Sequence, residues 1–570
     1  MEESNNIQTE NQEAYKLTIV QKRLRALGIL FLLFFAVIGV RLFWIQVVKS
    51  ESYLARAADQ RQYEFQSSLA RGQIFDRNMI SFTDRELKKF IAITEYVTDK
   101  NTTAEVVARA AGVSKDDVLE MIKESNGTIE LKAKDFSNKD IEAIEKGMVK
   151  GVSILEKKIR YSTDSLARHV IGYIKESDLN GMMGLEKSMN RILAQDGGER
   201  IVAIVDSHKN VIPSLGFRKV EDKGENTKLG LKLTLDFHIQ EIAESVLKDN
   251  NINGSAVVMD IKTGDILAMA STPDFDQNNV GNYLSGKKDE LTNKSITPYD
   301  LGSIFKTIVA AAAIENNIVN EEETFLCEGE IEVNKSIIKC SSFSSHKDRL
   351  ITFKEAFALS CNTTFVKVGT RVGAEKILEM AKRMGFSEKQ CNELLEEKAG
   401  YIPTSKEDGI GNISIGQGKI QVTPLQVTTM MAAIANNGIK NMPSIIDSIV
   451  DSESGKTVQT LSKSKPMLVL NMTTLNRLKD MLHEVTTIGT GKQANLDDFD
   501  GSSGKTSSAE TGIKSGEIVQ GWFAGFVPSN KPKYAITVFV YDGKSGGKVA
   551  APIFREIAYK IFTEYKPINP

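Results

Sequence analysis

The sequence predicts an α+β protein that carries a single membrane-spanning helix near its N-terminus. The run 24–48 is almost wholly apolar and is long enough to cross a bilayer as a helix. In the second half of the chain, strand-like hairpins at 255–271 and 521–541 flank a long block of helical patterns. Strands at both ends of a segment with helices between them are typical of the α+β class.

The apolar run is interrupted by Arg25 and Arg41. Arg25 lies near one end, and Arg41 is close enough to the other end for its side chain to reach the interface, where Trp44 also fits. The run is longer than the apolar core of a signal peptide, and the Ala-Arg-Ala sequence at 55–57 is a poor cleavage site. We therefore expect an uncleaved anchor, with only a slight charge bias towards a cytoplasmic N-terminus.

A chain of 570 residues is too long for one ordinary domain. The formal net charge is -2 and no long basic run occurs, so nucleic acid is not an expected partner. Five histidines leave little room for histidine-based catalysis. The Lys- and Glu-rich stretch 219–228 is the best candidate boundary. We predict a tail at 1–23, an anchor at 24–48, a middle domain at 49–225 and a C-terminal domain at 226–570.

Local patterns predict the individual elements. Apolar residues at helical spacing indicate amphipathic helices, and short alternating or apolar runs between turn residues indicate strands. Helices are expected at 115–124, 237–248 and 551–565, and strands at 231–235, 255–260, 265–271, 521–527 and 534–541.

Ser303 and Lys306 form the most informative pair in the chain. Ser-x-x-Lys occurs eight times, so the pattern by itself is weak. Ser303 differs because it follows a turn-like segment at 298–302 and opens a strongly apolar helix. There a lysine amine lies one turn from a serine hydroxyl near the positive end of a helix, as a serine nucleophile without a histidine base requires. The pair indicates acyl transfer.

Two later motifs support Ser303. Ser360-Cys361-Asn362 lies in the predicted helical stretch 353–368, and Lys505-Thr506-Ser507 precedes the C-terminal hairpin on a predicted edge strand. Either triplet alone is a chance-level match. Their order after Ser-x-x-Lys is specific for one class of serine acyl-transfer enzymes.

At this point the chain resembles the penicillin-binding proteins, in particular the monofunctional class B transpeptidases. Further similar motifs are collinear with the family's, at 71–78, 166–172, 184–186, 233–236 and 522–525. The resemblance implies a pedestal (dimerisation-like) domain over 49–225 and a penicillin-binding transpeptidase domain, an antiparallel sheet with a helical subdomain, over 226–570. It also implies a single-pass protein of the cell membrane with a cytoplasmic N-terminus and the catalytic domain on the extracellular face.

The implied activity is that of a peptidoglycan D,D-transpeptidase, which cross-links stem peptides ending in D-Ala-D-Ala and binds β-lactams covalently. No cofactor is expected for catalysis, and a polytopic membrane glycosyltransferase is the expected partner. The resemblance assigns Ser303 as nucleophile, Lys306 as base, Ser360 as proton relay, Asn362 as a ligand of the substrate amide, Lys505 and Thr506 as carboxylate ligands, and the N–H groups of Ser303 and Ser508 as the oxyanion hole.

Ser507 departs from the family pattern, which has glycine there. A side chain at this position is expected to narrow the cleft or alter the strand, with more effect on bulky β-lactams than on catalysis. Two other functions stay open: a β-lactam-hydrolysing relative, and a non-catalytic β-lactam sensor or scaffold.

Three of the four cysteines surround the second motif. Cys327, Cys340 and His346 have spacing compatible with a structural zinc, with Asp348 or Cys361 as the fourth ligand. A disulfide between Cys327 and Cys340 and unpaired thiols are the alternatives.

Overall fold

The computed structural model forms two compact units. One comprises residues 1–68, 89–155 and 199–222, and the other 69–88, 156–198 and 223–570. The structure describes residues 2–50, 53, 62–93, 97, 99–124, 129–132, 139–140, 144, 149, 151–175, 179–204, 217–221, 228–286, 289–334, 336–511 and 518–565.

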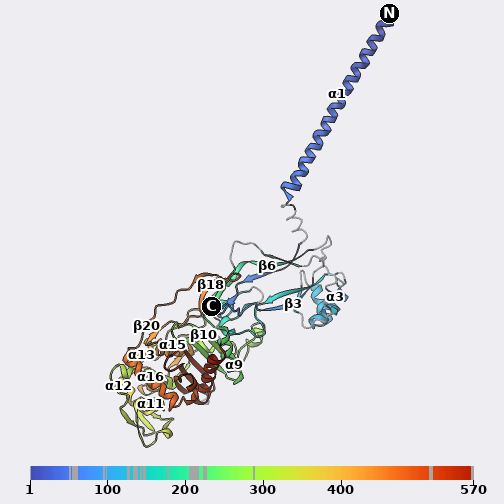
Figure 1. Ribbon diagram of the computed structural model, residues 1–570. Helices are drawn as coiled ribbons and strands as arrows, with labels where there is room; N and C mark the ends of the chain where they lie inside the picture. Colours follow the sequence, from blue (N-terminus) through green and yellow to red (C-terminus); the bar gives the residue numbers. More distant parts are fainter. Residues whose placement is uncertain are drawn as a thin grey trace. The chain divides into compact units, whose positions relative to one another are not determined.

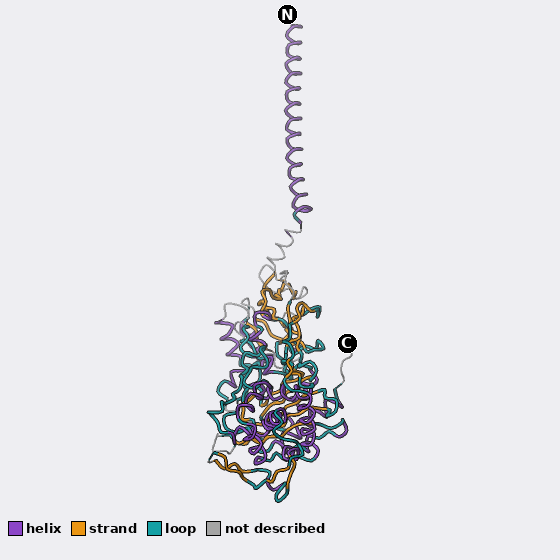
Figure 2. The backbone as a smooth tube through the Cα atoms, turned by 90° about the vertical axis from the view of Figure 1, so that its left-hand side faces the viewer, coloured by secondary structure: helices purple, strands orange, loops and turns teal. Residues whose placement is uncertain are grey.

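The first unit begins with the long helix α1 (Glu2–Phe43), which continues into a π-helical turn at Trp44–Val48. Figure 2 shows α1 as one continuous helix. The helix therefore begins well before the predicted anchor at 24–48. Within the described part of the chain, the segment Thr18–Val48 is the one helical stretch long and apolar enough to cross a membrane.

The rest of the first unit consists of two small sheets and two helices. One sheet has the order β1 (Gln62–Arg71), β6 (Ala194–Ile204), β7 (Phe217–Glu221), and the other the order β4 (Ile129–Lys132), β3 (Glu86–Ile93), β5 (Val152–Ile159). The helices α3 (Lys100–Ala111) and α4 (Lys115–Glu124) share an apolar core with the second sheet. The predicted helix at 115–124 is confirmed.

A five-stranded antiparallel sheet forms the centre of the second unit. Its order is β10 (Ile266–Thr272), β9 (Gly254–Asp260), β23 (Tyr534–Val540), β22 (Val519–Val527), β21 (Ser503–Glu510). Both predicted hairpins are confirmed. They meet where β9 pairs with β23, for example at Val258 and Ile536, so the sheet is built from both ends of the unit. The third motif lies on β21, at the edge of this sheet.

Helices cover both faces of the sheet. α9 (Phe237–Asp249) and α17 (Ala551–Thr563) share one apolar core with it, and the fully buried α15 (Pro424–Ala435) packs against the other face. Pro424 in the first turn and a capping box between Thr423 and Gln426 explain where α15 begins. The other helices pack on one another: α10 (Lys306–Glu315) contacts α12 (Asn362–Val372), α13 (Ala374–Arg383), α14 (Ile410–Ile415) and α16 (Met472–Thr487), and α11 (Phe353–Ala358) contacts α12 and α16. Several of these helices are labelled in Figure 1.

The remaining elements of the second unit are short. A four-stranded sheet has the order β19 (Thr457–Thr460), β18 (Ile446–Asp451), β8 (Leu229–Leu233), β2 (Ile74–Phe75). The strand expected at 231–235 therefore lies two residues earlier. Four pairs of short strands among the described residues are β11 (Tyr299–Asp300) with β16 (Gln421–Val422), β12 (Thr324–Leu326) with β15 (Leu350–Thr352), β13 (Glu330–Val333) with β14 (Ser336–Lys339), and β17 (Ile439–Lys440) with β20 (Met467–Leu468). The short helices are α6 (Arg168–Ile171), α7 (Gly184–Ser188) and α8 (Asn190–Leu193).

A buried ionic cluster within the second unit joins two of the family-like motif segments, 71–78 and 184–186, to the residues that follow β5. The Glu186 carboxylate, fully buried, accepts hydrogen bonds from Arg71 Nε (2.5 Å), Arg160 Nε (2.8 Å) and the Tyr161 hydroxyl (3.0 Å). Burial opposes its ionisation, but the two guanidinium groups hold the pKa of Glu186 below its usual range. Removing one partner of such a pair leaves a buried charge uncompensated.

Candidate active site

Ser303 lies in a short 3-10 turn, η5 (Gly302–Phe305), which leads directly into α10. Ser303 is half-buried, whereas Ile304, Phe305 and all but the last residue of α10 are buried. Gly302 has φ +60°, and its N–H donates to the carbonyl of Gly416 (2.9 Å). The glycine permits this left-handed turn. The turn places the Ser303 side chain at the edge of a buried apolar core.

Lys306 is fully buried and faces the second motif. Its Nζ donates to Asn362 Oδ1 (2.7 Å), the Ser360 carbonyl (2.8 Å) and Ser360 Oγ (3.1 Å). Burial lowers the pKa of Lys306 to about 8, although the Cys361 and Cys340 thiols act in the opposite direction. An amine with this pKa is neutral in part of the population near pH 7 and can accept a proton.

The second motif lies at a break between helices, so the predicted helical stretch at 353–368 is helical but interrupted at 359–361. α11 ends at Ala358 and α12 begins at Asn362. Between them Ser360 has φ +57°, a conformation that costs a non-glycine residue about 1–2 kcal/mol. The break lets both Ser360 and Asn362 contact Lys306. Asn362 Nδ2 also donates to the carbonyl of Lys339 (2.8 Å).

The third motif lies on the edge strand β21, which packs against η5. Side chains alternate along a strand, so Lys505 and Ser507 share one face, and Thr506 and Ser508 share the other. Lys505 is fully buried, and burial together with the charge of Lys306 lowers its pKa well below the usual value. Ser508 is exposed, and its Oγ accepts a hydrogen bond from the N–H of Gly546 (3.1 Å). An edge strand leaves alternate backbone N–H groups free to bind an extended ligand.

Ser507 is only 2% exposed. Its Oγ makes no hydrogen bond within the described residues, and a Cβ added at Gly302 would lie 2.5 Å from it. The Ser507 side chain therefore lies against the turn that carries Ser303 and occupies the space that a side chain at residue 302 would need. A side chain at residue 507, where the family has glycine, is expected either to narrow the cleft or to alter the strand. The geometry favours altered packing of the strand.

Two residues of this region, Gly416 and Thr490, lie outside the motifs identified in the sequence. Gly416 ends α14, and a Cβ there would lie 2.1 Å from the Gly302 carbonyl oxygen, so glycine is required. Thr490 follows α16, and its Oγ1 lies 2.5 Å from Thr506 Oγ1. The glycines at 489 and 491 are the sequence signal that could have pointed to this turn.

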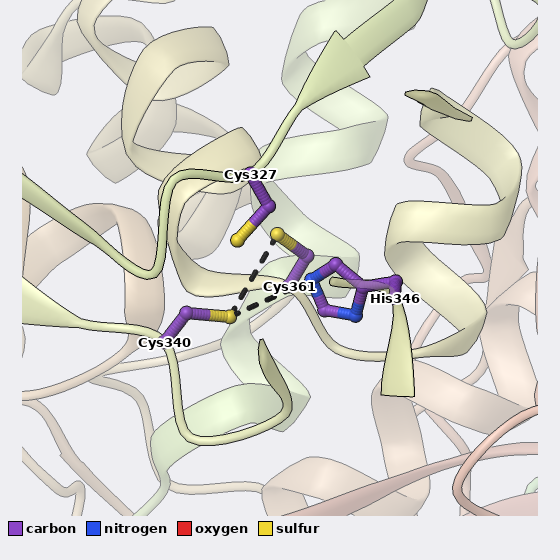
Figure 3. A group of neighbouring side chains, drawn as sticks. All are labelled: Cys327, Cys340, His346 and Cys361. Atoms are coloured by element: carbon purple, nitrogen blue, oxygen red, sulfur yellow. Dashed lines mark hydrogen bonds between the residues drawn. The ribbon is translucent and has the colours of Figure 1, made fainter. Parts of the chain in front are cut away.

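Four of the predicted metal ligands lie together in Figure 3, and one of them, Cys361, is the middle residue of the second motif. Cys327, Cys340, His346 and Cys361 are all buried, and their ligand atoms lie within 4.8 Å of one another. All four cysteines of the chain are described and are free thiols. Asp348, by contrast, is an exposed residue whose carboxylate pairs with Lys347 (3.9 Å). The geometry thus brings Cys361, rather than Asp348, to the other three.

The donor set fits a tetrahedral zinc ion. With Zn–S bonds of about 2.3 Å, neighbouring ligands of a tetrahedron lie roughly 3.8 Å apart. The distances from Cys340 Sγ to Cys361 Sγ and to His346 Nε2 are both 3.8 Å. His346 Nδ1 lies 3.0 Å from Ser345 Oγ, and hydroxyls of Thr363 and Thr364 lie 3.3 Å from Cys361 Sγ. Such hydrogen bonds typically orient metal ligands.

Comparison with known proteins finds two family models that match the chain. Residues 254–559 match the model of the penicillin-binding protein transpeptidase domain, and residues 67–229 that of the penicillin-binding protein dimerisation domain. Stage V sporulation protein D of Bacillus subtilis is 29% identical over 94% of this chain and 85% of its own length. Peptidoglycan D,D-transpeptidase MrdA of Acinetobacter baumannii is 25% identical over 94% of this chain and 87% of its own length.

Solved structures agree. Penicillin-binding protein 3 of Mycobacterium tuberculosis, in complex with aztreonam, has a TM-score of 0.63 at 24% identity and covers 89% of this chain and 98% of its own. Penicillin-binding protein A of the same organism, as a ceftriaxone acyl-enzyme complex, has a TM-score of 0.55 at 25% identity and covers 58% of this chain and 79% of its own. The first likeness shows the fold.

Proposed function

The chain belongs to the penicillin-binding protein transpeptidases and is a serine-type peptidoglycan D,D-transpeptidase that binds β-lactams, and we propose that Ser303 carries its chemistry. The observation that supports this most is the contact set of Lys306. A buried amine of lowered pKa, one turn from Ser303, is held by Ser360 and Asn362 of the second motif.

Acylation begins when neutral Lys306 Nζ accepts the proton of Ser303 Oγ, which attacks the carbonyl of the penultimate D-alanine. The backbone N–H groups of Ser303 and Ser508 receive the oxyanion. The proton passes through Ser360 Oγ to the departing amine, and the terminal D-alanine leaves. General-base help is worth about 10²–10⁴ in rate, and each oxyanion donor about 10²–10³.

Release of the acyl group uses the same proton path in the reverse direction. The amine of a neighbouring stem peptide attacks the ester carbonyl, loses a proton towards Ser360 and Lys306, and forms the cross-link as Ser303 is regenerated. With a β-lactam, ring opening leaves the amine attached to the acyl group. The departing group then remains in the site, where it hinders attack on the ester.

Lys505 and Thr506 are proposed to bind the terminal carboxylate of the substrate. Burial and the nearby charge of Lys306 disfavour the protonated form of Lys505. The carboxylate of an arriving substrate places a negative charge next to Lys505 and so favours its protonated form. Thr506 adds a hydroxyl that can donate a hydrogen bond to the same carboxylate.

Labelling with a fluorescent penicillin tests the assignment. We expect Ser303→Ala to abolish covalent labelling and cross-linking of a stem-peptide substrate. Ser245→Ala is the matched control, because Ser245 and Lys248 form another Ser-x-x-Lys pair, on α9. Full labelling of Ser303→Ala would refute the assignment. Labelling of the native chain without cross-linking would favour a sensor or scaffold, and rapid loss of the label a β-lactam-hydrolysing relative.

We also propose that Cys327, Cys340, His346 and Cys361 bind a structural zinc ion. The support is the burial of all four residues and the 3.8 Å separations around Cys340 Sγ. The hydrogen bond from Cys361 lowers the pKa of the Cys340 thiol, and the same contact raises the pKa of Cys361. One thiolate therefore forms readily, as metal binding requires.

Elemental analysis of the purified full chain tests the zinc site. We expect about one zinc per chain, lost in Cys327→Ser and retained in Cys391→Ser, since Cys391 is a buried thiol outside the cluster. A metal-free native chain would end the proposal. A disulfide between Cys327 and Cys340, found by mass spectrometry, would replace it.

We also propose the membrane topology and the partner that the sequence predicts. The N-terminus would be cytoplasmic and residues after 48 extracellular, with the domain boundary near 226, consistent with matches at 67–229 and 254–559. A polytopic membrane glycosyltransferase would supply the glycan strands, in contact with the apolar segment Thr18–Val48. Protease added outside intact spheroplasts should remove the extracellular part and spare an N-terminal tag.

A further inference from the structure

The turn after α16 brings Thr490 to the third motif. Thr490 Oγ1 lies 2.5 Å from Thr506 Oγ1, a short hydroxyl–hydroxyl contact. Thr506 is 5% exposed, whereas Thr490 is exposed. Thr490 therefore stands between solvent and the hydroxyl that is proposed to bind the substrate carboxylate.

A hydroxyl has one hydrogen, so the direction of this bond matters. Among the described residues, the other acceptor near Thr490 Oγ1 is the Ala358 carbonyl oxygen at 3.5 Å, which is too far for a strong hydrogen bond. Either hydroxyl of the pair can be the donor, and the weak contact with Ala358 leaves the hydrogen of Thr490 available for donation to Thr506. The hydrogen of Thr506 is then left free for an incoming anion.

The backbone fixes Thr490 despite its exposure. Its N–H donates to the Ala358 carbonyl (3.1 Å), two residues before Ser360. A Cβ at Gly489 would lie 2.3 Å from the same carbonyl oxygen, and a Cβ at Gly547 would lie 2.5 Å from the Thr490 oxygen. The turn is thus held closely between the second motif and the segment after β23. Its hydroxyl is positioned before any ligand arrives, which reduces the entropy lost on binding.

We propose that Thr490 is a positioning residue that directs the Thr506 hydroxyl towards the carboxylate of the substrate or of a β-lactam. The inference rests on the proposed roles of Ser303 and Thr506. Thr490 acts through Thr506, so its effect should depend on the ligand's negative charge.

Acylation of the full chain by benzylpenicillin and by its methyl ester, which lacks the anion, tests this. We expect Thr490→Val to lower the second-order acylation rate with benzylpenicillin about tenfold, the effect of one hydrogen bond to a charged group. With the methyl ester the change should be less than about twofold. Thr490→Ser should restore most of the rate. The control is Thr487→Val, because exposed Thr487 bonds only to the carbonyls of His483 and Glu484 within α16 (3.3 Å each) among the described residues.

Three results would overturn the inference. They are an unchanged rate in Thr490→Val, an equal loss with both probes, and a failure of Thr490→Ser to recover. An equal loss that coincides with a lowered thermal midpoint would assign Thr490 a structural role instead. Failure of the proposed function is separate, because the native chain would then not be acylated at Ser303 at all.

Discussion

The contact between Ser507 and Gly302 allows a prediction from a pair of substitutions. Gly302→Ala places a Cβ 2.5 Å from Ser507 Oγ and 3.1 Å from Ala509 Cβ, at a residue with φ +60°. The left-handed conformation alone costs alanine about 1–2 kcal/mol, and overpacking typically adds about 1–3 kcal/mol. The turn must shift, and Ser303 shifts with it.

We therefore expect Gly302→Ala to reduce acylation by benzylpenicillin about 100-fold, the size of loss that misplacing a reacting group by roughly 1 Å can cause. Ser507→Gly alone should change the rate less than about threefold, because the buried Oγ lies against the turn. In the double variant the contact with Oγ is gone while the φ cost remains. The double variant should be about tenfold faster than Gly302→Ala, a coupling of about 1.4 kcal/mol.

The assay is the second-order rate of fluorescent penicillin labelling, measured on the detergent-solubilised full chain for all four proteins. A double variant no faster than Gly302→Ala would refute the steric reasoning. A tenfold loss in Ser507→Gly alone would also contradict it, since the hydroxyl would then take part in binding or chemistry.

Two further predictions concern charge. The acylation rate should rise with pH between 6 and 9 with a midpoint near 8, because Lys306 must be neutral to accept a proton and is neutral above its pKa; a flat profile for the rate of penicillin labelling would contradict this. Glu186→Gln should lower the thermal midpoint by roughly 6–20 °C, because it leaves the buried Arg71 and Arg160 without their carboxylate. Glu105→Gln, which removes an exposed partner of Arg109, should change the midpoint by less than about 2 °C, and equal shifts in the two variants would rule out the buried pair as the cause.

Much of the second unit was predictable because its signals are local. Apolar runs between turn residues marked the strands of both hairpins, and helical periodicity marked α9 and α17. The family motifs then supplied the catalytic set, whose roles stay predictions until they are measured.

Features set by tertiary contacts were not predictable in the same way. The break at Ser360 depends on a positive φ in a residue other than glycine, which no local pattern signals. Thr490 lies outside every motif named above, so its contact with Thr506 could not be inferred from the sequence. The spacing of the cysteines left Asp348 and Cys361 equal as a fourth ligand, and only the packing of the turn after α11 brings Cys361 to the others.

The proposed chemistry depends most on Ser303 as the nucleophile. Peptide mapping by mass spectrometry after brief exposure to benzylpenicillin tests this directly. We expect one acyl adduct, on the peptide that contains Ser303, in the native chain and no adduct in Ser303→Ala. An adduct on another serine, such as Ser502 or Ser545, would contradict it.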